Sequence, residues 1–373
     1  MKKIPFLLWI LLTWVLYWPL AASARRTDKK LGGKKRVLFL PQFTRIGDIV
    51  CSTPVLYNIK KKYPDSHIAV IVSKKAFGIL KNNRRIDEFI LVEEYSTMGL
   101  IKKIRQGKFN WSLNLSSTST NTCLVLWGRI SNRIKTVVET PPITERLTDW
   151  MSNHKLLYKN HTYLPAHHTK LLGFMGITDI EDKKEVELSA QAEIKAEQWR
   201  KNLPQNMRIV GLSITAGNKI KELGDEKFAV LAKKLLEIEN IGICCIGAPG
   251  DIPRIDAFIE KVGSTRCFKA QGFNLEELPS LMKRFSLYIA VDTGPIYIAH
   301  ALGVPLIDII GPVDPHEQPP QDDTSIRVLP RGSIEPSSFV FKRRGSPSEI
   351  RKSIESTEVS DIAAAAIRLL ERR

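Results

Sequence analysis

Asp48 stands where a residue could act as a general base. It follows the apolar run 37–40 and a short loop containing Arg45 and Gly47, at a point where a helix is predicted to begin. Loops at the carboxyl ends of parallel strands border the ligand crevice of open α/β sheets, so a carboxylate there could remove a proton from a substrate hydroxyl. Gly47 would let the chain turn tightly before it. The alternative is that Asp48 only caps the helix, which is worth about 0.5–2 kcal/mol.

Three further loops, each after a predicted strand, could together bind a phosphorylated ligand. The loop 213–221 carries hydroxyl groups and two lysines, the loop 247–251 is rich in glycine, and the turn 292–295 begins a helix. Backbone N–H groups at a helix start bind anions, and a lysine can neutralise phosphate charge. Capping turns and solvent-exposed lysines are the alternatives. The candidate binding residues are Thr215, Lys221, Asp251, Asp292, Thr293, Gly294 and Pro295.

A rhythm of strands and helices that occurs twice must position these loops. Short apolar runs alternate with amphipathic stretches over residues 36–115 and again over 209–310, which predicts parallel sheets with helices on both faces. Residues 137–205 break the rhythm and are interpreted as an insertion that leads into a linker. The expected fold is α/β, with two Rossmann-like, doubly wound domains facing a cleft.

Several other chemistries are not supported by the sequence. It contains no GxGxxG or GxxxxGK[ST] loop, no HExxH and no GxSxG. Its five cysteines show no CxxC spacing, and the histidines His161, His167 and His168 are interpreted as surface residues rather than metal ligands. We therefore expect neither a metal nor a cofactor.

The charge of the chain is unevenly distributed. The 373 residues carry a net charge of +17, of which +8 lies in residues 1–36 and +3 in residues 342–373. The long central part keeps only +6, without an aromatic–basic repeat or a recognisable nucleic-acid motif. The excess therefore favours an anionic membrane or a phosphorylated ligand over nucleic acid as the partner.

Residues 4–24 form an apolar segment that predicts contact with a membrane. About 21 residues suffice for a spanning helix, and the basic run 25–36 after it favours a body on the cytoplasmic side. Ala22-x-Ala24 also resembles a signal-peptidase site, so a cleaved, secreted protein is the alternative. A coding sequence that starts too far upstream would account for the segment as well.

The order of motifs over residues 36–320 resembles glycosyltransferase family 9, the ADP-heptose:lipopolysaccharide heptosyltransferases. The resemblance rests on the following motifs: Arg45-Ile-Gly-Asp48-Ile-Val with Thr53-Pro54, Lys221 before Glu226-Lys-Phe228-Ala, Gly247-Ala-Pro-Gly-Asp251, Asp292-Thr-Gly-Pro295 and Gly311-Pro-Val-Asp-Pro315. It implies a fold of GT-B type, in which the first domain binds the acceptor and the second binds the nucleotide-sugar. It also implies inverting transfer without a metal.

The resemblance assigns roles and partners. Asp48 matches the proposed catalytic base, Lys221 matches a lysine near the donor phosphates, and residues 292–294 match donor-contacting positions. The implied partners are a nucleotide-sugar, ADP-heptose, and a lipopolysaccharide or related glycolipid acceptor at the cytoplasmic face of the bacterial inner membrane. The expected domains are 1–24 (signal-anchor or signal peptide), 25–35 (basic linker), 36–190 (acceptor domain), 191–205 (linker helix), 206–340 (nucleotide-sugar domain) and 341–373 (C-terminal helix).

Three positions depart from the family pattern, all in the second half. Tyr297 occupies the usual place of a histidine, although His300 follows one helical turn later. The family's KxWP reads Lys221-Glu-Leu-Gly224, and the threonine-rich turn before it reads Thr215-Ala-Gly-Asn218. These changes leave a second interpretation open, in which the protein binds a nucleotide-sugar or carbohydrate without catalysis.

Overall fold

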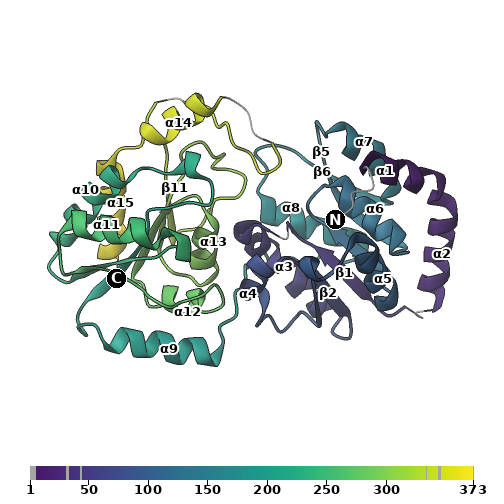
Figure 1. Cartoon of the computed structure of the whole chain (residues 1–373), viewed down its shortest axis with the longest axis horizontal. Helices are drawn as coiled ribbons and strands as arrows, with labels where there is room; N and C mark the ends of the chain where they lie inside the picture. Colours follow the sequence, from purple (N-terminus) through teal and green to yellow (C-terminus); the bar gives the residue numbers. More distant parts are fainter. Residues whose placement is uncertain (1–5, 31–32, 43, 333, 343–345, 373) are drawn as a thin grey trace. The chain divides into compact units, whose positions relative to one another are not determined.

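The computed structural model describes residues 6–30, 33–42, 44–332, 334–342 and 346–372. They form two compact units, residues 1–183 (unit 1) and 184–373 (unit 2), each of which has its own sheet (Figure 1).

Unit 1 is built on a parallel sheet with the strand order β3-β2-β1-β4-β5-β6. Its strands are β1 (Arg36–Leu40), β2 (His67–Val72), β3 (Glu88–Leu91), β4 (Trp111–Asn114), β5 (Asn132–Val138) and β6 (His154–Tyr158). Residues 37–40 of β1 are all at most 1% exposed. Because successive side chains of a strand point to opposite faces, this burial means that helices cover both faces of the sheet.

The helices of unit 1 follow the strands in sequence. They are α3 (Ile46–Lys62), α4 (Lys74–Leu80), α5 (Thr97–Gly107), α6 (Ser119–Trp127), α7 (Ile143–Thr148) and α8 (Leu164–Lys170). On one face, Leu38 and Ile71 of the sheet share an apolar cluster with Ile104 of α5 and Val125 of α6. This packing fixes where each loop at the sheet edge begins.

The apolar N-terminal segment folds as two helices rather than the single helix expected. α1 (Phe6–Val15) and α2 (Tyr17–Lys30) meet at a break, and their apolar parts are bent by 63°. Pro19 has no N–H to bond to the carbonyl of Val15, which explains why the first helix ends there. Within the described residues, only this bent pair, and no single helix, has the length and composition to cross a membrane.

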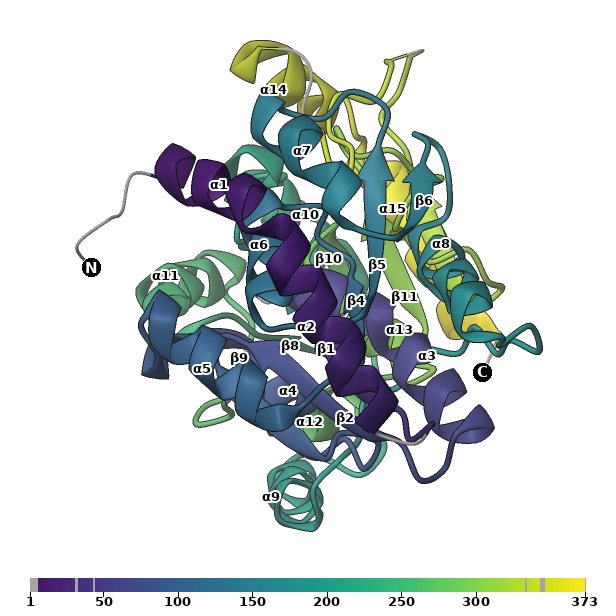
Figure 2. The ribbon, with the colours of Figure 1, turned by 90° about the vertical axis from the view of Figure 1, so that its right-hand side faces the viewer.

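The helix pair packs on unit 1 (Figure 2). Ile10 and Ala24 are at most 2% exposed. The Trp127 indole of α6 donates to Thr13 Oγ1 at 2.8 Å, and the Trp14 indole donates to the Leu147 carbonyl at 3.0 Å. One side of the pair is thus part of the folded unit.

Unit 2 repeats the topology, with the strand order β12-β11-β10-β7-β8-β9 and parallel pairing throughout. Its strands are β7 (Arg208–Ser213), β8 (Ile241–Cys245), β9 (Cys267–Lys269), β10 (Leu287–Val291), β11 (Leu306–Ile309) and β12 (Ser325–Val328). Its helices are α9 (Ala190–Lys201), α10 (Asp225–Leu236), α11 (Ile252–Val262), α12 (Leu278–Met282), α13 (Gly294–Ala301), α14 (Pro347–Glu355) and α15 (Val359–Glu371).

The interpretation of residues 137–205 as an insertion is wrong in part. β5 and β6 belong to the first sheet, and β6 is its edge strand. The short strands β9 and β12 were likewise not expected. With them, each sheet has six strands, and each has a switch point between its first and fourth strands, β1 and β4 in unit 1 and β7 and β10 in unit 2.

Candidate active site

Asp48 lies in the first turn of α3, directly beyond the carboxyl end of β1. The helix begins at Ile46, and Arg45 is its N-cap with an extended backbone. Asp48 is therefore not the cap, and the capping interpretation is wrong. Gly47 lies inside the helix, so it makes no special turn. A carboxylate in a first turn is stabilised by the helix dipole.

Asp48 is largely shielded from solvent, with 4% of its surface exposed. Arg45 Nη1 lies 3.7 Å from Asp48 Oδ2, while the arginine side chain itself is 62% exposed. The arginine thus sits between the carboxylate and water. Asp48 thus lies at the switch point of unit 1 with a cation beside it.

A polar loop after β4 is the part of this edge that the sequence analysis missed. β4 pairs directly with β1, so the loop from Asn114 to Asn121 starts next to the loop that leads to Asp48. Asn114 Oδ1 accepts from Ser116 Oγ at 3.0 Å, and Asn121 Nδ2 donates to Ser116 Oγ at 2.7 Å. The signal was present as the run Ser-Ser-Thr-Ser-Thr at 116–120.

In unit 2, Lys221 and Asp292 form an ion pair at the switch point. Lys221 Nζ lies 2.7 Å from Asp292 Oδ2. Lys221 is in the loop after β7 and Asp292 directly follows β10, and these two strands are paired neighbours. The fold therefore brings together two candidate residues that are 71 positions apart.

Tyr297 holds the other oxygen of the same carboxylate. Its phenol donates to Asp292 Oδ1, and both side chains are buried, at 2% and 6% exposure. Tyr297 is in α13, in the turn that follows Asp292. The tyrosine that replaces the usual histidine is thus an anchor for Asp292.

The loops after β7 and β8 are also tied together. Thr215 Oγ1 donates to Asp251 Oδ2 at 3.0 Å, and the same oxygen accepts from the Ala248 N–H at 2.9 Å. Glu222, which sequence reasoning did not select, accepts from the Ala216 N–H at 3.1 Å and pairs with Arg254 at 2.7 Å. These contacts fix the shape of the edge around Lys221.

The start of α13 completes this edge. Thr293 is the N-cap with an extended backbone, Gly294 is the first helical residue and Pro295 follows it. The first N–H groups of a helix lack intrahelical partners and form a site for anions. His300, at the far end of the helix, contacts Lys184 Nζ through Nδ1 at 3.1 Å and Asp322 through Nε2 at 2.5 Å.

Asp308 is a buried carboxyl group behind this edge. It lies in β11 beside β10, is fully buried, and neither of its oxygens has a hydrogen-bond partner within the described part of the chain. Burial raises its pKa well above the ordinary value, and the nearby charge of Asp292 raises it further.

Two of the three histidines are not surface residues, which corrects that expectation. His167 and His168 of α8 are each 2% exposed. Burial lowers the pKa of His167 to about 4 and that of His168 to about 3. In the ranges that the structure describes, no group of three or more His, Cys, Asp or Glu side chains could hold a metal ion.

Two doubly wound units in one chain define a fold of GT-B type, as expected. The fold is similar to the glycosyl transferase family 9 structure from Veillonella parvula DSM 2008, with a TM-score of 0.76 and 20% identity over 91% of this chain and 98% of that one. It is also similar to E. coli ADP-heptose lps heptosyltransferase II, with a TM-score of 0.71 and 16% identity over 91% and 99%. The iron-containing dodecameric glycosyltransferase TibC of enterotoxigenic E. coli is more distant, with a TM-score of 0.55 and 10% identity over 91% and 76%.

The chain belongs to glycosyltransferase family 9 (heptosyltransferase), whose family model matches residues 137–336. It is 22% identical over 289 residues to lipopolysaccharide heptosyltransferase 3 of E. coli K12, which covers 72% of this chain and 80% of that protein. It is 24% identical over 286 residues to lipopolysaccharide heptosyltransferase 1 of Campylobacter coli, covering 72% and 82%. The expected family is thereby confirmed.

Proposed function

We propose that this protein transfers a heptose from ADP-heptose to a lipopolysaccharide core or related glycolipid acceptor, with inversion at the anomeric carbon. The observation that carries the proposal is the ion pair of Lys221 and Asp292 at the switch point of unit 2, where α/β sheets bind their ligands. The relatives named above are heptosyltransferases, and one solved neighbour is named for ADP-heptose.

Asp48 is the proposed general base. It takes the proton of the acceptor hydroxyl as the oxygen attacks the anomeric carbon, and the bond from that carbon to the diphosphate breaks. Arg45 places a positive charge 3.7 Å from this carboxylate. The polar loop 114–121 offers hydroxyl and amide groups at the same edge, which suit the hydroxyls of a sugar acceptor.

The donor diphosphate is the proposed ligand of the second edge. Lys221 balances its charge, and the start of α13 at residues 293–295 offers N–H groups to its oxygens. Asp292, anchored by Tyr297, holds the lysine in place. Thr215 and Asp251 shape the adjacent wall. Because these groups would bind the diphosphate and balance its charge, transfer is proposed to need no metal. Added EDTA should therefore leave the rate of transfer unchanged.

We also propose that the protein works at the cytoplasmic face of the inner membrane. The outer side of the helix pair exposes Leu7, Leu11 and Trp18 at 60%, 61% and 72%. The basic run 25–36 follows it. Apolar side chains beside dense positive charge favour binding to an anionic lipid surface.

The test of the base is Asp48→Asn in the full-length protein, assayed with ADP-heptose and extracted lipopolysaccharide. Loss of a general base lowers kcat by about 10²–10⁴-fold. Asp65→Asn, an exposed aspartate of unit 1, is the matched control and should keep full activity. Donor binding, followed as the thermal shift with ADP, should be the same in both variants. Unchanged transfer by Asp48→Asn would rule out its role as the base.

The second candidate function is binding without catalysis. It is favoured by the departures at Lys221-Glu-Leu-Gly224 and Tyr297. A wild-type protein that is stabilised by ADP-heptose but transfers nothing to any lipopolysaccharide or glycolipid acceptor would support this alternative over transfer.

A further inference from the structure

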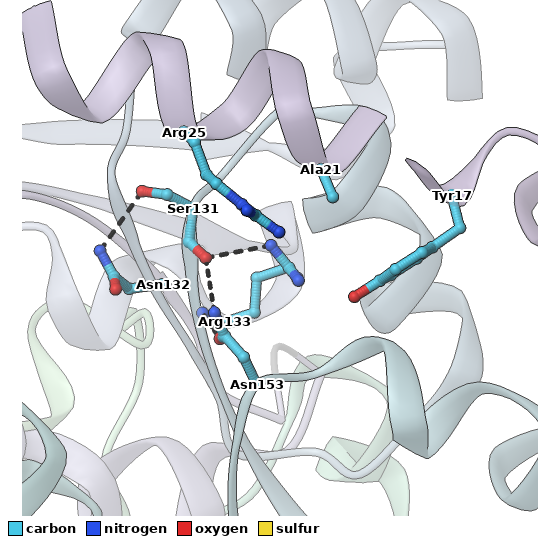
Figure 3. Close-up of a pocket in the computed structure, with 7 residues that line it drawn as sticks. All are labelled: Tyr17, Ala21, Arg25, Ser131, Asn132, Arg133 and Asn153. Carbon is cyan, nitrogen blue, oxygen red and sulfur yellow. Dashed lines mark hydrogen bonds between the residues drawn. The ribbon is translucent and has the colours of Figure 1, made fainter. Parts of the chain in front are cut away.

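A polar pocket of about 300 Å³ lies in unit 1 between α2 and the sheet (Figure 3). Its walls come from α2, from the start of β5 and from the turn before β6. The lining residues are Tyr17, Ala21, Arg25, Ser131, Asn132, Arg133 and Asn153.

This pocket is separate from the candidate active site. Residues 131–133 stand at the amino end of β5, and Asn153 immediately precedes β6. Asp48 follows the carboxyl end of β1 in the same parallel sheet. A strand rises about 3.3 Å per residue, so the seven residues of β5 place the two ends of the sheet roughly 20 Å apart.

Arg133 is a buried cation that has no acidic neighbour in this pocket. It is 3% exposed, and its guanidinium donates to the main-chain carbonyls of Ile130 at 2.7 Å, Met151 at 2.9 Å and Ser131 at 3.0 Å. None of the seven lining residues is acidic. Burying a charge without an opposite charge is costly, so the site favours an anion.

A second guanidinium faces the same space. Arg25 of α2 extends toward Arg133, and the Tyr17 hydroxyl points into the pocket from the other side (Figure 3). Burial is the main cause that lowers the pKa of Arg133; the Tyr17 hydroxyl opposes this shift, and the charge of Arg25 adds to it. An anion between them would remove this repulsion.

The walls are preorganised by neutral groups. The Asn153 side chain accepts from the main-chain N–H of Arg133 at 2.7 Å and donates to the main-chain carbonyl of Ser131 at 2.8 Å. Asn132 donates to the Asn110 carbonyl at 3.0 Å. These bonds hold the main chain around Arg133 in one shape, as a specific binding site requires.

We propose that this pocket binds the phosphate group of a phosphate ester between Arg25 and Arg133. The guanidinium of Arg25 is a planar fork that matches phosphate oxygens in pairs. Arg133, whose Nε and Nη1 already donate to main-chain carbonyls, contributes chiefly its positive charge. The pocket is larger than a single water, which takes about 30 Å³, so it has room for a phosphate and a short organic substituent. Because α1 and α2 expose apolar side chains, the ester is an anionic lipid headgroup or a soluble phosphate of the same chemistry.

The test uses full-length protein and isothermal titration with three probes: inorganic phosphate, monomeric dihexanoylphosphatidylglycerol, and vesicles with or without phosphatidylglycerol. Arg25→Gln removes one cation from an exposed position and should weaken binding of the phosphorylated probes about tenfold or more. Arg25→Lys keeps the charge without the fork and should show an intermediate loss. Arg84→Gln, on the turn before the opposite edge strand β3, is the matched control and should bind like wild type.

The outcomes separate the sources of the phosphate. Tighter binding of the short-chain lipid than of phosphate identifies a headgroup, and equal binding identifies the phosphate group alone. The proposal is overturned if Arg25→Gln binds the phosphorylated probes as tightly as wild type, or if Arg84→Gln loses as much affinity for them as Arg25→Gln does. Glycosyl transfer to a soluble acceptor should be unaffected by Arg25→Gln, so failure here is distinguishable from failure of the proposed reaction.

Discussion

Asp292 illustrates how a single residue depends on its neighbours. Its carboxylate is almost fully buried, with Lys221 on one oxygen and the Tyr297 hydroxyl on the other. A buried carboxylate is tolerable only when it is paired and hydrogen-bonded. Tyr297, in place of a histidine, therefore gives Asp292 an uncharged hydrogen-bond donor. His300 cannot take this part in the described arrangement, since its ring is held by Lys184 and Asp322.

Tyr297→Phe tests this arrangement. It removes one hydrogen bond to a buried charge, which is worth about 1.5–3 kcal/mol. We expect weaker ADP binding by roughly tenfold or more, measured by isothermal titration, because Asp292 would then hold Lys221 less firmly. Tyr288→Phe is the control: it loses a buried hydroxyl whose partner is Ser213 at 2.7 Å, and it should keep wild-type ADP affinity. Equal ADP affinity in both variants would contradict the role of Tyr297.

At the scale of elements, the strands that the sequence predicted are mostly apolar along their length. β1 and β10 are buried along almost their whole length and were recognised directly. β5 was not predicted because it contains Arg133 and Lys135, and charged residues usually lie on the surface. In the structure Lys135 is fully buried and lies 2.6 Å from Asp149 Oδ1. This ion pair depends on tertiary contacts, which cannot be predicted from the sequence alone.

The residues of the candidate site could likewise be predicted from the sequence only in part. Asp48, Lys221 and Asp292 could be selected because each directly follows or lies close behind a predicted strand. The pairing of Lys221 with Asp292 could not, since it depends on β7 and β10 being neighbours. The polar loop after β4 was overlooked for a similar reason: its importance comes only from the pairing of β4 with β1.

The packing of α8 predicts a loss of stability in acid. His167 contacts Thr136 Oγ1 of β5 at 3.2 Å and is buried, so its pKa is about 4 in the folded state. The unfolded histidine, with a pKa near 6.5, binds a proton first as the pH falls. The contribution of His167 to stability is therefore complete above about pH 6.5 and falls by roughly 2 kcal/mol at pH 5. His168, buried beside it with a pKa of about 3, adds a loss of similar size.

The measurement is urea unfolding between pH 7 and pH 5, followed by tryptophan fluorescence. Six of the seven tryptophans lie in unit 1, so the signal reports chiefly on that unit. His167→Gln should unfold with a shallower pH dependence. His161→Asn is the control, because His161 is exposed and asparagine tolerates its left-handed backbone with φ of 62°. A wild-type pH slope in His167→Gln would show that this histidine is not the acid-sensitive group.

At the scale of the whole molecule, the charge excess belongs to the ends of the chain. Residues 1–36 carry +8 of the net +17, next to a helix pair with one buried and one exposed side. The same segment thus joins three features: packing on α6, an apolar outer surface, and positive charge. Its exposed leucines and tryptophans account for membrane contact without charge, whereas the basic run accounts for a preference for anionic lipid.

These two contributions predict different responses to salt. Screening shortens the reach of charges to about 10 Å at 0.1 M salt, so attraction to anionic vesicles should weaken steeply as salt is added. The apolar contribution should persist, leaving a small, salt-insensitive binding to neutral vesicles that cosedimentation can measure. Replacing the exposed Leu7, Leu11 and Trp18 by serine should abolish this residual binding, and serine at the half-exposed Ile194 of unit 2 should not. Equal binding to neutral and anionic vesicles at low salt would mean that the basic run takes no part, and would leave the apolar side of the helix pair as the whole of the membrane contact.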